Sequence, residues 1–174
     1  MPEPQPVANK AELARFETCS RKSPTSLDFS GQCGRPLRAA PADWQCFADA
    51  PGRQGWIARA AERPGTISFP LLLSGNNATL SVGFLRSYEG FGNAQLWLDD
   101  DVGRAMSLNG TWDSPTSEPD LLVVSEATLC GPTCAAASAT RGKKGNHRHA
   151  AHVRMLPEPQ RSTRKFKLLL LESC

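Results

Sequence analysis

Short apolar or alternating runs, separated by turn-forming residues, dominate the chain from residue 56 onward. Each run has the length of a typical strand and is bounded by Gly, Asn, Asp or Pro. The expected strands are 56–58, 66–73, 79–86, 94–98, 104–108, 121–125, 152–156 and 165–171. Because no helical pattern alternates with them, we expect a mainly β fold, an antiparallel β-sandwich of the jelly-roll-like kind.

Alternation within these runs predicts which side chains face the core. Ala94, Leu96 and Leu98 share one face of their strand, whereas Gln95 and Trp97 share the other. Further inward-facing candidates, chosen by the same alternation, are Leu122, Val124, Phe166, Leu168 and Leu170.

The first 50 residues have a different character, because breaks at proline and glycine are frequent and only residues 11–17 have a helical pattern. A chain of 174 residues fits one domain with irregular ends. We therefore expect an irregular, disulfide-tethered N-terminal extension over residues 1–50. A sandwich domain follows over 51–174, with a basic loop at about 135–150.

The cysteine count favours disulfide bonds, because the six cysteines are an even number and most stand in segments rich in turn residues. Cys130–Cys134 is the pair expected first. Asn77 and Asn109 begin glycosylation sequons, which agrees with an extracellular or secretory setting. The N-terminus lacks a signal-peptide pattern, so if the chain is secreted we expect a fragment, an unusual gene model or a piece of a larger protein whose leader lies elsewhere. No apolar run approaches the roughly 20 residues of a membrane span.

One spacing matches a metal motif. Cys130, Cys134, His147 and His152 have the separations of a two-cysteine, two-histidine zinc finger. The residues between Cys134 and His147 include no aromatic residue or Leu to build a finger core, and two glycines there weaken a helix. We therefore favour a disulfide bond over a metal site, and predict no cofactor.

Two other groups are weaker metal candidates. In an extended segment His147 and His149 face one side and His152 faces the other, which does not favour a three-histidine site. Residues 99–101 are three aspartates that could offer oxygens to Ca²⁺, but they lack the longer ligand pattern of a calcium loop. A hairpin loop over residues 99–103 is the preferred interpretation.

Charge is unevenly distributed along the chain. Residues 99–126 hold seven acidic residues and one basic residue, whereas Arg141–Lys167 holds nine Lys or Arg and one acid. The basic stretch could bind an anionic partner, but a solvated basic surface is the preferred interpretation. A zinc-stabilised, nucleic-acid-binding protein is the alternative function that this stretch suggests.

The most distinctive string is Gly83-Phe-Leu-Arg-Ser-Tyr-Glu-Gly-Phe-Gly92. Within it Arg86, Tyr88 and Glu89 could contact a sugar or peptide, because an aromatic face beside charged groups suits polyhydroxylated ligands. The alternative is a structural corner in which Tyr88 bonds to backbone and Arg86 pairs with Glu89. No nucleophile, zinc-hydrolase or phosphate-loop motif is present, so no catalytic residue is predicted.

Several short strings, taken in order, resemble the C-terminal β-rich region of plant and green-algal secreted proteins related to SGNH (GDSL-like) hydrolases. They are Gly55-Trp-Ile-Ala58, Gly65-Thr-Ile-Ser-Phe69, the string 83–92, His152-Val-Arg-Met-Leu-Pro157 and Lys165-Phe-Lys167. The resemblance covers about Trp44 to Cys174 and implies an extracellular or cell-wall setting. The nucleophile block and the late Asp-x-x-His block of such hydrolases are missing from these residues, so no catalytic residue is carried over.

These observations predict a non-catalytic accessory or binding module of a secreted or cell-wall protein that contacts glycan. The alternatives are the nucleic-acid-binding protein described above and a hydrolase fragment that lacks its catalytic blocks.

Overall fold

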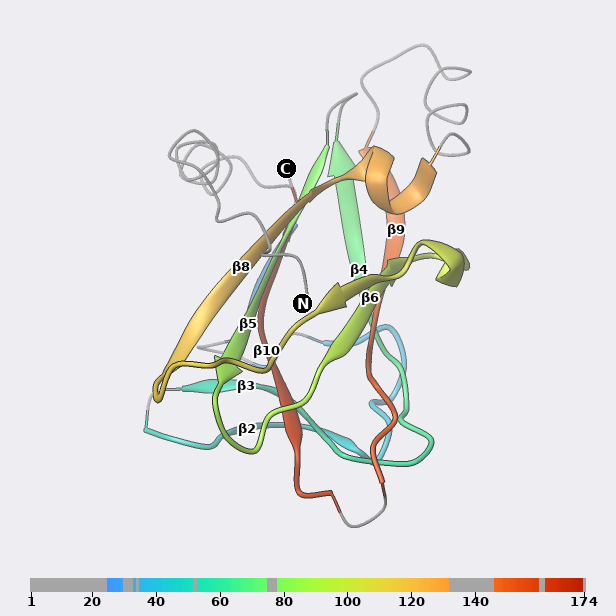
Figure 1. Ribbon diagram of the computed structural model, residues 1–174. Helices are drawn as coiled ribbons and strands as arrows, with labels where there is room; N and C mark the ends of the chain where they lie inside the picture. Colours follow the sequence, from blue (N-terminus) through green and yellow to red (C-terminus); the bar gives the residue numbers. More distant parts are fainter. Residues whose placement is uncertain are drawn as a thin grey trace.

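The computed structural model describes residues 25–29, 33, 35–51, 53–74, 78–131, 146–159 and 162–173. Within these residues ten strands form two sheets that face each other (Figure 1). The strands are β1 (Thr25–Asp28), β2 (Trp44–Ala48), β3 (Gln54–Arg59), β4 (Ile67–Ser74), β5 (Thr79–Ser87), β6 (Ala94–Leu98), β7 (Met106–Leu108), β8 (Ser117–Ser125), β9 (Asn146–Met155) and β10 (Lys165–Ser173).

Both sheets are antiparallel. The larger sheet has the order β2-β3-β10-β5-β8, with β1 paired to β10, and the smaller sheet has the order β4-β9-β6-β7. Neighbouring strands are often far apart in sequence, as with β4 and β9, which is typical of sandwiches with crossing connections. The prediction of a mainly β, antiparallel sandwich is confirmed.

The core lies between the two sheets and follows the predicted alternation. Ala94, Leu96 and Leu98 are buried on the inner face of β6, and Phe166 and Leu168 are buried on the inner face of β10. Aromatic rings from the two sheets meet here, as where Trp56 of β3 packs edge-on against Phe69 of β4. Burial of these apolar side chains is the main source of stability for such a sandwich.

One predicted core residue is wrong, and a β-bulge explains it. The register between β10 and β5 shifts between Leu168 and Leu170, so one extra residue enters β10 there. As a result Leu171, rather than Leu170, continues the buried row that Phe166 and Leu168 begin. Leu170 instead lies against Gly83, where an added Cβ would come within 2.9 Å of the Leu170 Cβ.

Several strand boundaries also differ from the sequence prediction. β9 begins at Asn146 rather than at 152, because it pairs residue by residue with β4 as far as Ser74. β8 begins at Ser117 rather than at 121, because it pairs along the whole of β5. Long-range pairing thus extends strands into polar sequence that has no local strand signal.

The described residues among the first 50 form two strands that the sequence pattern did not reveal. β1 pairs with β10, and β2 pairs with β3 so that Cys46 lies opposite Trp56. A disulfide bond joins Cys33 to Cys46, with their Cα atoms 5.9 Å apart. The expected helical pattern at 11–17 lies outside the described residues, and the division of the chain at residue 50 stays a prediction.

A short helical segment, 126–131, follows directly after β8 and lies beside β9 at one end of the sandwich (Figure 1). Cys130 lies in this segment and is disulfide-bonded. Its partner, and Cys134, which was predicted to be that partner, lie outside the described residues. Among the described residues no helix has the length and apolar character needed to cross a membrane.

Candidate functional site

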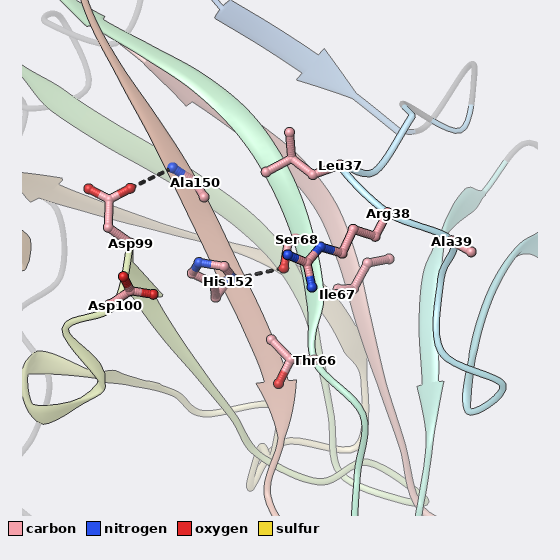
Figure 2. Close-up of a pocket in the computed structure, with 10 residues that line it drawn as sticks. All are labelled: Leu37, Arg38, Ala39, Thr66, Ile67, Ser68, Asp99, Asp100, Ala150 and His152. Atoms are coloured by element: carbon pink, nitrogen blue, oxygen red, sulfur yellow. Dashed lines mark hydrogen bonds between the residues drawn. The ribbon is translucent and has the colours of Figure 1, made fainter.

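An open pocket of about 580 Å³ lies on the outer face of the smaller sheet. We call it the β4–β9 pocket (Figure 2). Four separate segments of the chain meet there: a loop before β2, the start of β4, the turn after β6, and β9. Its lining residues are Leu37, Arg38, Ala39, Thr66, Ile67, Ser68, Asp99, Asp100, Ala150 and His152.

The loop wall of the pocket is anchored at two places, by a hydrogen bond to β4 of the smaller sheet and by a disulfide bond to β2 of the larger sheet. The Leu37 backbone N–H donates a hydrogen bond to the Ser68 carbonyl, 2.7 Å away, so residues 37–39 run along the edge of β4. The Cys33–Cys46 disulfide bond closes the loop that carries these residues. The pocket therefore depends on covalent and hydrogen-bonded anchors on both sides of Arg38.

His152 forms the floor of the pocket in a fixed orientation. Its Nδ1 is hydrogen-bonded to the Ser68 Oγ at 2.7 Å, as Figure 2 shows. Its ring stacks on Trp97 with centroids 5.4 Å apart, and the guanidinium of Arg154 lies 5.3 Å from the same indole. Because Trp97 is only 7% exposed, the imidazole and not the indole is presented to a ligand.

The electrostatic surroundings favour a neutral His152. Burial lowers the pKa of His152 below its usual 6.5, and the nearby Arg38 lowers it further. Asp99 and Asp100 act in the opposite direction, but they do not outweigh the burial. The pocket thus combines a cation, carboxylates, a hydroxyl and a neutral imidazole around an opening.

The turn after β6 has the hairpin-loop geometry that the sequence predicted. Asp99 adopts a φ of 49°, in the left-handed region that aspartate tolerates, and its Oδ1 accepts a hydrogen bond from the Ala150 N–H at 2.8 Å. Residues 102–104 form a single 3-10 turn instead of the start of the return strand. Asp100 is exposed and lines the pocket.

The predicted ligand-binding residues Arg86, Tyr88 and Glu89 lie at the end of β5, away from the β4–β9 pocket. Arg86 pairs with Asp120 at 3.1 Å, not with Glu89, and its guanidinium lies 4.1 Å from the ring of Trp112. Tyr88 is 55% exposed, and Glu89 is exposed beside it. The cluster therefore divides into an anchored Arg86 and an accessible Tyr88–Glu89 pair.

The zinc-finger spacing does not describe the local geometry. His152 faces the pocket, whereas the histidine brought close to Cys130 is His149. His149 and His152 lie on opposite faces of β9, as the alternation predicted. The side chain of His147 and the whole of Cys134 lie outside the described residues.

The structure describes one of the two sequons. Asn77 lies outside the described residues. Asn109 is half-buried, and its Oδ1 accepts hydrogen bonds from the Thr111 N–H at 3.1 Å and the Thr111 hydroxyl at 2.6 Å. Glycosylation of either stays a prediction.

Several described members of the basic stretch are engaged within the fold. Lys165 and Lys167 both bind the carboxylate of Asp49, and Arg164 pairs with Glu158. Residues 141–145, the most basic part of the predicted loop, lie outside the described residues. Internal pairing reduces the charge that these lysines offer to an anionic partner.

No protein-family model matches the chain, and no curated protein matches it. Among solved structures the chain is similar to a two-domain esterase (CEX) active on acetylated mannans, co-crystallised with mannopentaose. The TM-score is 0.56 at 16% identity, over 86% of this chain and 36% of the esterase chain.

Two isolated modules give lower scores. A CBM36 domain of a multidomain xylanase from the hindgut metagenome of Trinervitermes trinervoides has a TM-score of 0.48 at 6% identity, over 86% of this chain and 95% of that domain. A family 6 carbohydrate-binding module from Clostridium cellulolyticum has a TM-score of 0.46 at 10% identity, over 86% of this chain and 96% of that module. The chain thus spans about a third of the matched esterase chain and shares the fold of that part.

Proposed function

We propose that the chain is a non-catalytic, carbohydrate-binding accessory module of a longer carbohydrate-active protein, and that glycan binds in the β4–β9 pocket. The observation that carries this proposal is the pocket itself, which is open and places Arg38, Asp100 and His152 around one volume. The likeness to part of a two-domain esterase active on acetylated mannans supports it at the level of fold.

The chemistry of the pocket suits a neutral sugar. Each sugar hydroxyl is both a donor and an acceptor, so a carboxylate such as Asp100 and a guanidinium such as Arg38 can bind neighbouring hydroxyls. The exposed Leu37 offers an apolar contact for the C–H face of a ring. Because Asp99 and Asp100 stand beside Arg38, an acidic sugar would gain from the cation but be repelled by the carboxylates.

Tyr88 and Glu89 are proposed as a second, separate contact for a longer glycan. The tyrosine ring is accessible and can cover the apolar face of a sugar, while Glu89 accepts hydrogen bonds from hydroxyls. Arg86 supports this loop through its contacts with Trp112 and Asp120, and its role as a ligand contact stays a prediction.

A further part of the proposal concerns the longer protein that contains this module and the compartment in which it works. We propose a secreted protein in which this module accompanies an ester hydrolase of the SGNH type, with Asn77 and Asn109 as glycan acceptors. The Cys33–Cys46 bond and the disulfide-bonded Cys130 support an oxidising compartment. The residue strings that resemble SGNH-related proteins support the hydrolase partner.

A panel of immobilised glycans tests the proposal. Protein purified from a secretory host should bind a neutral polysaccharide, with mannan and acetylated mannan as first probes, and should release no acetate from acetylated mannan. Folded protein that binds no glycan on the panel would contradict the proposal, as would acetate release by the isolated chain.

A further inference from the structure

A second polar cluster lies at the end of the sandwich where residues 126–131 stand beside β9. Asp99 Oδ2 is 2.7 Å from the His149 Nδ1, and Glu126 Oε1 is 3.5 Å from the His149 Nε2. The side chains of His149 and Glu126 are only 8% and 11% exposed. The Cys130 Sγ and donor atoms of Asp99 and His149 all lie within 4.8 Å of one another. We call these four residues the His149 cluster.

The cluster is built by three elements and is distinct from the pocket. Asp99 comes from the turn after β6, Glu126 and Cys130 come from the helical segment, and His149 comes from β9. Asp99 belongs to both sites; its Oδ2 lies beside His149, and its Oδ1 accepts a hydrogen bond from the Ala150 N–H. The inference below therefore does not rest on glycan binding.

Both ring nitrogens of His149 face a carboxylate oxygen, Nδ1 that of Asp99 and Nε2 that of Glu126. If a metal ion binds one ring nitrogen, the carboxylate beside the other nitrogen fixes the tautomer, which is the usual support for a metal-binding histidine.

Cys130 determines which cation the cluster can hold. In its disulfide-bonded state the sulfur carries no negative charge, whereas a thiolate is a strong ligand for Zn²⁺. We propose that reduction of the disulfide bond made by Cys130 converts the His149 cluster into a Zn²⁺ site, with Cys130, His149 and carboxylate oxygen as its protein ligands. In the disulfide-bonded protein the site is closed to zinc.

The reduction step is an ordinary exchange with a dithiol. The S–S bond of Cys130 breaks, Cys130 and its partner become thiols, and the two thiols of the reductant form a disulfide bond. The Cys130 thiol then loses its proton as Zn²⁺ binds, so metal uptake releases a proton and is weaker at low pH.

The test compares metal binding by the full chain before and after reduction. A trialkylphosphine is the reductant of choice, because it is itself oxidised to the phosphine oxide and leaves no competing dithiol in solution. The reduced protein should bind one Co²⁺ per chain and show a thiolate-to-metal charge-transfer band. Added Zn²⁺ should displace the Co²⁺ and abolish this band. The disulfide-bonded protein should show no such band.

Variants identify the ligands. His149→Gln should weaken Zn²⁺ binding by the reduced protein at least tenfold, since even the loss of a supporting partner of a metal ligand costs about 10–100-fold. Glu126→Gln should weaken it as well. His152→Gln is the matched control, because His152 faces the pocket on the other side of β9, and it should leave the Zn²⁺ affinity unchanged.

Three results would contradict the inference. Equal metal binding before and after reduction would show that Cys130 is not a ligand, and equal losses for His149→Gln and His152→Gln would show that the cluster is not the site. If the reduced, metal-free protein unfolds, Zn²⁺ must restore its circular dichroism, since binding to the folded form stabilises it. Failure to restore it would also overturn the inference.

Discussion

The outer face of each sheet carries a cluster of charged and polar side chains. We call Asp49, Arg53 and Lys167 on the larger sheet the closed cluster, and Arg38, Asp100 and His152 on the smaller sheet the open cluster. On the larger sheet Lys167 is 0% exposed, and its Nζ binds the Asp49 Oδ1 at 2.5 Å and the carbonyl of Arg53. On the smaller sheet Arg38 and His152 line the β4–β9 pocket.

The difference comes from what covers each face. The turn after β2 places Asp49 and Arg53 over Lys167, and Gly55 leaves room for that side chain. An added Cβ at Gly55 would lie 2.9 Å from the Lys167 Cε. The loop 37–39 instead runs along the edge of the smaller sheet and leaves an opening. Comparable residue types thus stabilise the fold in one place and are available to a ligand in the other.

The largest expected loss of stability follows from removing the Asp49 carboxylate from the closed cluster. Asp49→Ala leaves the Lys167 ammonium buried without its carboxylate, which should lower the free energy of unfolding by about 3–5 kcal/mol. Denaturant titration measures the change. Arg164→Ala is the control, because its pair with Glu158 involves a 54% exposed side chain and should cost about 0–1 kcal/mol. Equal effects of the two substitutions would contradict a structural role for the closed cluster.

Removal of the Cys33–Cys46 disulfide bond should cause an intermediate loss of stability. The double variant Cys33→Ser/Cys46→Ser should lose about 2–4 kcal/mol of stability, because the unfolded chain gains entropy when the bridge is absent. It should also weaken glycan binding, since the freed loop carries Arg38. Unfolding curves and glycan titrations on the same samples separate the two effects. Unchanged affinity at conditions where the variant is folded would show that the loop is not part of the site.

The smallest effect is a pH dependence at the open cluster. The pKa of His152 is lowered by burial, so the unfolded chain takes up a proton before the folded one does as pH falls. Stability linked to His152 is therefore complete above pH 6.5 and is lost as pH falls from 6.5 through the lower folded pKa. His152→Gln should flatten this part of the curve of unfolding free energy against pH. An unchanged slope in the variant would assign it to another group.

The closed cluster should titrate in a different window. Burial raises the pKa of Asp49, but hydrogen bonds and attraction from Lys165 and Lys167 outweigh it, so the pKa is lowered below 3.8. The stability that Asp49 supplies is present above pH 3.8 and is lost as pH falls below it. The two clusters can therefore be followed separately in one acid titration.

Much of the sandwich could be predicted because its strands carry period-2 patterns. The faces of β6 and the opposite orientations of His149 and His152 follow from alternation alone. Leu170 could not be placed, because a bulge shifts the register and nothing in a run of leucines marks where the extra residue enters. β2 was missed because its partner, β3, supplies the pairing that its own sequence does not signal.

The pocket could not be predicted for a different reason. Its walls come from residues near 38, 68, 100 and 152, and only the folded sheet brings these together. Likewise the sequence placed Arg86 beside Glu89, which is near in the chain, whereas its partner is Asp120 across the strand pair. Local spacing favours neighbours in sequence, and sheets pair residues that are distant in sequence.

The central claim, that the open cluster is the glycan site, is tested most directly by titration calorimetry with mannopentaose. The double variant Arg38→Ala/Asp100→Ala removes two exposed charged groups of the pocket without disturbing buried residues. Each lost hydrogen-bonding group is worth about 1–3 kcal/mol when its ligand partner is left unpaired, so the affinity should fall at least tenfold while the unfolding midpoint stays the same. An affinity that persists in this variant and disappears in Tyr88→Ala would contradict the account and move the site to the end of β5.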